Sequence, residues 1–144
     1  MSLHQHELTL RRTLHVPLNQ LWNAWVDPAE LAEWFTDEAE QDVRVGGRYR
    51  NSDGDNGEFL EVVPGETLRF TWEQPDYAPG GIVALHFRQL SQEASELLLH
   101  HSGIACDDEA DLHIAWSWGL DSLVAWLERG EKLDYESWAT RQSL

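Results

Sequence analysis

Two hydrophobic periodicities divide this chain and constrain its fold more than any other feature. Between about residues 42 and 104, apolar side chains repeatedly fall on every second position, as in strands with one buried face. Between residues 112 and 127 they recur at three- and four-residue intervals, as on one face of a helix of about four turns. A curved antiparallel sheet followed by one long amphipathic helix accounts for both patterns.

The N-terminal part of the chain predicts one strand and two short helices. Residues 7–15 alternate between apolar and polar positions, and Arg12 falls on the apolar side. Pro17 is well placed to open a helix, because proline fits the first helical turn. Farther on, Asp27 can cap a second helix, and Glu30 can reach back to the free amides as in a capping box.

Turn signals divide the segment after residue 40 into extended runs. Residues 46–47, 53–57 and 64–66 carry glycines or asparagine, which tolerate the positive φ angles of tight turns. Another turn near residues 91–93 joins the last two extended runs. With the N-terminal strand, six or seven strands are expected.

Composition narrows the classes of function. The chain has 144 residues, and its net charge is −16 because 26 acidic residues face 10 basic ones. This length suits one domain with its own core, and the charge opposes binding to nucleic acid or to an anionic membrane. No apolar run reaches the roughly 20 residues that span a bilayer, and the N-terminus lacks the features of a signal peptide. We therefore expect a cytoplasmic protein, in which the single Cys106 cannot form an internal disulfide.

The order of these elements, with the residues that carry them, resembles the helix-grip proteins of the START/Bet v 1-like superfamily. More narrowly, it resembles the family named after the C-terminal domain of the Hsp90 ATPase activator. The matching segments are LWNAWVDPAELAEWF, VGGRYR, GEFLEVVPGETLRFTW, HHSG and GLDSLVAWL, within a resemblance that covers residues 7 to about 129. It implies an α+β fold in which a curved antiparallel sheet of six to seven strands wraps around a long C-terminal helix. We expect residues 1–130 to form this single domain and residues 131–144 to form a loosely packed tail.

The resemblance also implies a hydrophobic pocket between the sheet and the last helix, and a small apolar or weakly polar molecule as its ligand. By parity, His101 shares the apolar face of its strand and His100 the opposite face. His101 could orient a ligand; alternatively, it bonds a nearby carbonyl or carboxylate and completes the core. The residues expected to line the pocket are Leu68, Phe70, Trp72, Leu85, Phe87, Leu99, His101, Trp116 and Leu120.

Two other classes of function remain open at this stage. One is a protein-interaction module, chaperone-linked or stress-linked, whose acidic exterior binds a basic partner. The other is a cyclase-like or hydrolase-like enzyme with His101 or a nearby carboxylate as acid or base. We expect no hydrolytic triad, because no nucleophile elbow is present. No metal or cofactor is expected either, since residues 53–58 have the wrong register for a calcium loop.

Two further features suggest contacts. Arg12 on an inward face needs a partner, and a structural ion pair with Glu61 is the expected one. On the last helix, Trp118 and Ile114 point away from the apolar stripe. They predict an interface with a second copy of the chain, or cover by the C-terminal tail through Trp138.

Overall fold

A computed structural model describes residues 6–77 and 80–142 of the chain. Within these residues the fold is α+β, with seven strands in one sheet and a long helix near the C-terminus, as the two periodicities predict. The strands are β1 (His6–Leu14), β2 (Ala39–Gln41), β3 (Arg48–Asn51), β4 (Asn56–Val63), β5 (Thr67–Thr71), β6 (Ile82–Ser91) and β7 (Ala94–Ile104). The helices are α1 (Leu18–Val26), α2 (Pro28–Trp34), the 3-10 turn η1 (Cys106–Asp108), α3 (Glu109–Arg129) and α4 (Tyr135–Arg141).

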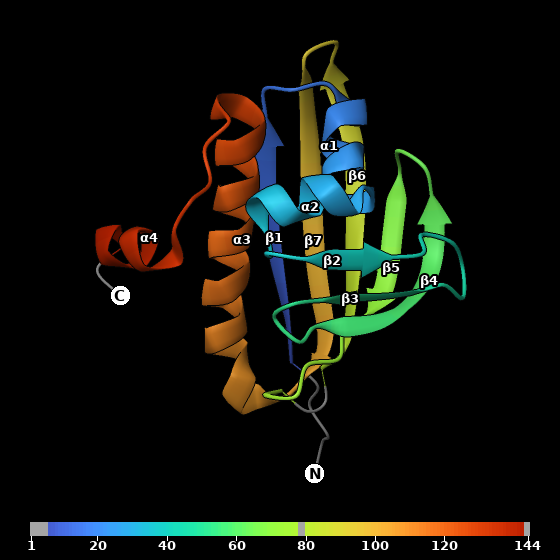
Figure 1. Cartoon of the computed structure of the whole chain (residues 1–144), viewed down its shortest axis with the longest axis vertical. Coiled ribbons are helices and arrows are strands. Elements are labelled where there is room, and N and C mark those ends of the chain that lie inside the picture. Colours follow the sequence, from blue (N-terminus) through green and yellow to red (C-terminus); the bar gives the residue numbers. More distant parts are fainter. Residues whose placement is uncertain (1–5, 78–79, 143–144) are drawn as a thin grey trace.

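The sheet has the spatial order β1-β7-β6-β5-β4-β3-β2, and all neighbouring strands are antiparallel. Its register aligns the apolar faces, since Leu99 of β7 lies opposite both Leu10 of β1 and Leu85 of β6. Burial alternates along β7, so that His101 is buried while His100 is half-buried on the other face, as parity predicts. The long strands form the back of the molecule, and the short β2 and β3 curl in front of them (Figure 1).

Helix α3 runs beside β1 along the length of the sheet, and α1 and α2 lie across the front of the long strands (Figure 1). The buried residues of α3 repeat at helical spacing and include Leu112, Trp116, Leu120 and Leu123. The helix ends at Gly130, whose φ of 66° is a left-handed conformation that glycine adopts without strain. The core therefore fills the space enclosed by the sheet, α3 and the two short helices.

Helix α2 begins as predicted, because Asp27 Oδ1 accepts a 2.9 Å hydrogen bond from the amide of Ala29. The predicted capping box is wrong, however. Glu30 Oε2 instead accepts a 2.9 Å hydrogen bond from Nε1 of Trp126. This contact joins α2 to α3, so the side chain stabilises the packing of two helices and not the end of one.

The C-terminal tail is anchored to the domain through Trp138, whereas most of its other described side chains are exposed. Asp134 caps α4, and Trp138 on this helix is only 5% exposed. Its Nε1 donates a 2.9 Å hydrogen bond to Oδ2 of Asp121 on α3. A buried indole with a partner for its N–H holds the tail in place.

Tail residues also cover Trp118, which was one of the two predicted interpretations. Its Nε1 donates a 3.0 Å hydrogen bond to the Leu133 carbonyl, and its ring meets Tyr135 edge to face. The covering residues thus differ from the expected Trp138. A homodimer through Trp118 and Ile114, both half-buried, remains a prediction.

The expected ion pair between Arg12 and Glu61 is wrong. Arg12 faces α3, where its Nε lies 3.0 Å from Oδ1 of Asp121. Glu61 lies on β4 and pairs with Arg69 of the neighbouring β5 at 3.7 Å. In the part of the chain that the structure describes, no helix combines the length and apolar character that crossing a bilayer requires.

Candidate functional site

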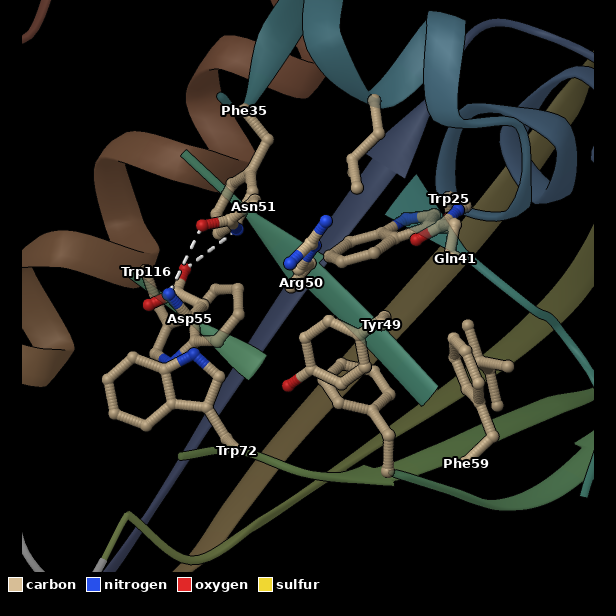
Figure 2. Close-up of a pocket in the computed structure, with 13 residues that line it drawn as sticks. Trp25, Phe35, Gln41, Tyr49, Arg50, Asn51, Asp55, Phe59, Trp72 and Trp116 are labelled. Carbon is tan, nitrogen blue, oxygen red and sulfur yellow. Dashed lines mark hydrogen bonds between the residues drawn. The ribbon is translucent and has the colours of Figure 1, made fainter. Parts of the chain in front are cut away.

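A narrow pocket lies where the curled β2–β3 hairpin faces α1, α2 and α3 (Figure 2). Its walls are mainly aromatic, and a few polar side chains gather at one end. The residues that line it are Trp25, Leu31, Phe35, Gln41, Tyr49, Arg50, Asn51, Asp55, Phe59, Leu68, Phe70, Trp72 and Trp116.

Ring contacts hold the aromatic wall together. Phe35 stacks on Trp116, with 5.7 Å between ring centroids and 14° between ring planes. Tyr49 meets Phe70 edge to face at 5.3 Å, and its hydroxyl donates a 2.7 Å hydrogen bond to the Thr71 carbonyl. Burial, followed by the nearby carboxylates of Asp55 and Glu73, raises the pKa of the Tyr49 hydroxyl far above its ordinary value. Tyr49 therefore lines the pocket as an uncharged side chain.

These rings leave little free space. The cavity measures about 40 Å³, whereas a cavity of about 150 Å³ is known to bind benzene. Water fits the present space, but an organic ring requires one of the wall side chains to move. Phe35 and Tyr49 are the two half-buried rings of this wall; the Tyr49 hydroxyl is held by a hydrogen bond, whereas Phe35 follows the last turn of α2 and has no polar anchor.

The polar end of the pocket is built around Asp55. This carboxylate is only 6% exposed, and it accepts a 3.0 Å hydrogen bond from Nδ2 of Asn51 (Figure 2). It accepts a second one, of 2.8 Å, from Nε2 of Gln74. Burial raises the pKa of Asp55, and the Asp53 carboxylate raises it further, whereas the hydrogen bonds from Asn51 and Gln74 lower it and the nearby N–H of Trp72 lowers it slightly. Among the described residues, Asp55 forms no ion pair with a basic side chain. A buried carboxylate that is held by neutral donors alone is costly to keep charged.

Two buried indole N–H groups in the pocket wall lack a hydrogen-bond partner within the described part of the chain. They belong to Trp25 on α1 and Trp72 after β5, which are 5% and 7% exposed. The other buried indoles are paired; Trp34 Nε1, for example, donates to the Ala24 carbonyl at 2.9 Å. An unpaired buried donor costs about 1–3 kcal/mol, so each one is a place where a ligand acceptor would stabilise the protein.

The structure brings four of the nine predicted pocket residues to this cavity: Leu68, Phe70, Trp72 and Trp116. The other five are buried elsewhere in the core, and they are Leu85, Phe87, Leu99, His101 and Leu120. Contact of any of the nine with a ligand stays a prediction.

His101 is satisfied within the protein. Its Nε2 lies 2.6 Å from the Gly80 carbonyl, and its Nδ1 accepts a 2.9 Å hydrogen bond from Nε1 of Trp116. Burial lowers the pKa of His101. The geometry therefore matches the predicted alternative in which His101 bonds a nearby carbonyl and completes the core. His100, on the other face, lies 3.3 Å from a carboxylate oxygen of Glu7.

Asp55, Asn51 and Gln74 are the polar residues that sequence reasoning missed. The segment around Asp55 reads as a tight turn at Asn56 and Gly57; the turn instead lies at residues 52–54, and Asn56 and Gly57 already belong to β4. The alternation of side chains along a strand could have identified Asp55 as an inward residue, because Asp55, Gly57 and Phe59 lie on the same face and are all buried. Because Phe59 and Leu60 are both apolar, sequence alone did not fix which of them faces inward.

Comparison with known proteins agrees with this architecture. The model of the family described as Activator of Hsp90 ATPase homolog 1-like protein matches residues 15–128. Comparison with curated proteins gives no match.

Three solved structures show the likeness of the fold. CalU16 from Micromonospora echinospora is 22% identical, with a TM-score of 0.78 over 88% of this chain and 78% of its own. The Aha1 dimer from Colwellia psychrerythraea is 18% identical, with a TM-score of 0.76 over 88% of this chain and 98% of its own. An Hsp90 activator from Plasmodium falciparum is 20% identical, with a TM-score of 0.72 over 84% of this chain and 94% of its own. By its sequence match and its helix-grip fold, the chain belongs to the family of Activator of Hsp90 ATPase homolog 1-like proteins.

Proposed function

We propose that this protein binds a small, flat, largely apolar molecule in the aromatic pocket between the β2–β3 hairpin, the short helices and α3. The observation that carries the proposal is the pair of unpartnered buried indole N–H groups, of Trp25 and Trp72, in the wall of that pocket. A core that served packing alone gains nothing from orphan donors, because each one costs stability.

Binding requires the pocket to widen. The present space of about 40 Å³ is well below the roughly 300 Å³ of ordinary ligand sites. Rotation of the Phe35 ring away from Trp116 enlarges it at the cost of one stacked pair, about 0.5–1.5 kcal/mol. Burial of a ligand's apolar surface, at about 25 cal/mol per Å², offsets that cost.

A neutral fluorescent probe tests the proposal. We expect N-phenyl-1-naphthylamine to bind the protein and to bind Phe35→Ala more tightly, because that change enlarges the cavity. Leu31→Phe fills the cavity from α2 and is expected to abolish binding. Leu98→Phe adds the same ring on the opposite face of the sheet and is the matched control, with unchanged binding.

The probe titration also contains the result that would refute the proposal. If neither the natural protein nor Phe35→Ala binds the probe, the pocket is part of a filled core. If the probe does bind, native mass spectrometry of protein taken directly from cells identifies the natural ligand, which should be absent from the Leu31→Phe preparation.

A second candidate, binding to a basic protein surface, is favoured by the charge. Nine of the ten basic side chains already pair with carboxylates, so the net charge of −16 comes from unpaired acidic groups. Two similar folds are an Hsp90 activator and an Aha1 protein, which makes Hsp90 the partner to test. Association that weakens with salt and persists in Leu31→Phe supports this candidate.

A further inference from the structure

Asp55 and Trp72 form a donor–acceptor pair that the protein itself leaves incomplete. Trp72 faces the carboxylate closely enough to favour its charged form. No hydrogen bond of normal geometry joins the two groups, and Nε1 of Trp72 has no other partner among the described residues. Both side chains line the pocket, and the Trp72 nitrogen lies on the edge of its ring that faces Asp55 (Figure 2).

The carboxylate retains the capacity to accept another hydrogen bond. Its two oxygens offer about four lone-pair positions, and Asn51 and Gln74 each occupy one. The same end of the pocket therefore offers at least one free acceptor position, on Asp55, and one free donor, on Trp72.

Among the common neutral oxygen groups, only a hydroxyl satisfies both positions with a single atom. A carbonyl oxygen accepts from Trp72 but places its lone pairs against the carboxylate. An ammonium group donates to Asp55 but cannot accept from the indole. A hydroxyl oxygen accepts one hydrogen bond and donates another. We infer that the pocket's ligand carries a phenol-type hydroxyl group, which donates to Asp55 and accepts from Trp72; this inference rests on the proposed function.

The neighbouring walls indicate what the hydroxyl is attached to. Trp116 lies beside Trp72, with 6.5 Å between ring centroids, and stacks on Phe35. A group held between Asp55 and Trp72 thus extends into a space bounded by ring faces, which suits an aromatic ring better than a flexible chain. The hydroxyl is then attached directly to a flat ring.

Three probes of similar size separate these contributions. 2-Naphthol offers a donor and an acceptor, 2-methoxynaphthalene an acceptor only, and 2-methylnaphthalene neither. Their dissociation constants are measured by ligand-observed NMR. The indole N–H signal of Trp72, assigned from the Trp72→Phe variant, reports whether the probe reaches this end of the pocket.

We expect 2-naphthol to bind at least about tenfold more tightly than either analogue, because a hydrogen bond to a charged group contributes about 1.5–3 kcal/mol. Asp55→Asn should remove this preference while 2-methylnaphthalene still binds. Asp53→Asn changes an exposed carboxylate two residues away and should keep the preference. Trp72→Phe should weaken binding of both oxygen-bearing probes relative to 2-methylnaphthalene.

Different results would overturn the hydroxyl inference and the proposed function. Equal affinities of the three probes for the natural protein overturn the hydroxyl inference and leave an apolar pocket in place. The absence of binding by all three, together with no binding of N-phenyl-1-naphthylamine, overturns the proposed function itself. These comparisons use the natural protein, so they remain decisive if a variant does not fold.

Discussion

Trp116 Nε1 donates a 2.9 Å hydrogen bond to Nδ1 of His101, and this contact fixes the protonation of the imidazole. Since Nδ1 is the acceptor, the proton of the neutral ring is on Nε2, which donates to the Gly80 carbonyl at 2.6 Å. Helix α3, strand β7 and the segment before β6 are thereby joined through one buried ring.

The neutral His101 ring makes stability depend on pH. Burial lowers the pKa of His101 below its ordinary value of 6.5. The unfolded chain therefore binds a proton at a higher pH than the folded one, so this contribution is complete above pH 6.5 and is lost as the pH falls. We expect the free energy of unfolding, measured by urea titration, to decrease by up to about 1.4 kcal/mol per pH unit below that value.

His101→Gln tests this assignment. The variant should lose about 1–3 kcal/mol at pH 7.5, because buried hydrogen-bonding groups lose their partners, and its stability should decrease less steeply at acid pH. His100→Gln, on the other face of the same strand, should keep the steep decrease. A slope that survives in His101→Gln would assign the acid sensitivity to other groups.

The pKa of Asp55 should shift in opposite directions when two of its neighbours, Asn51 and Asp53, are replaced. Asn51→Ala removes a hydrogen bond that favours the carboxylate, so the pKa of Asp55 should increase further. Asp53→Asn removes a nearby negative charge, so the pKa should decrease. NMR titration of the side-chain carboxyl carbon measures both shifts, and two shifts of the same sign would contradict the geometry.

The raised pKa of Asp55 also has a cost for stability. Its folded pKa lies above the ordinary 3.8, because of burial, so the charged carboxylate favours unfolding at neutral pH. This penalty decreases as the pH falls through the folded pKa. A residue that destabilises the fold is more readily explained by binding than by packing.

The sequence predicts the architecture well, because periodicity reports which face of each element is buried. The positions of the strands and of α3 follow from alternation and helical spacing, and so does the inward side chain of His101. Partners across the fold do not follow in this way. Arg12 pairs with Asp121 and not with Glu61 because its face of β1 meets α3, a relation that depends on three-dimensional packing. The full outline of the pocket does not follow from sequence for the same reason, since it depends on how β2 and β3 curl over the sheet.

The anchoring of the tail is testable through Trp138. Trp138→Ala removes a large ring that is 5% exposed and leaves Asp121 without one of its donors. We expect a loss of about 3 kcal/mol in the free energy of unfolding, since truncation of a buried tryptophan typically costs about 3–5 kcal/mol and α4 is peripheral. Glu136→Gln on the exposed side of α4 should change stability by less than about 0.5 kcal/mol. Equal stabilities of the two variants would mean that the tail does not contribute to the fold.

Replacement of Gly119 and of Gly57 by alanine should change the stability of the protein in opposite directions. Gly119 lies within α3, and a Cβ added there would lie 3.6 Å from the Phe35 ring, an ordinary van der Waals distance. Because glycine destabilises a helix interior by about 0.5–1 kcal/mol relative to alanine, Gly119→Ala should stabilise the protein by about that amount.

Gly57 lies on β4, where an added Cβ would overlap the Thr71 carbonyl oxygen of the neighbouring strand. That oxygen also accepts the hydrogen bond from the Tyr49 hydroxyl. Gly57→Ala must therefore separate β4 from β5 and disturb the pocket wall, and we expect a loss of about 1–3 kcal/mol. Thermal and urea unfolding measure whether the free energy of unfolding increases in Gly119→Ala and decreases in Gly57→Ala.

If Gly119→Ala is destabilising instead, the Phe35 ring is less free to move than ligand entry requires. Phe35→Ala in the same background should then remove the destabilisation that the added Cβ causes.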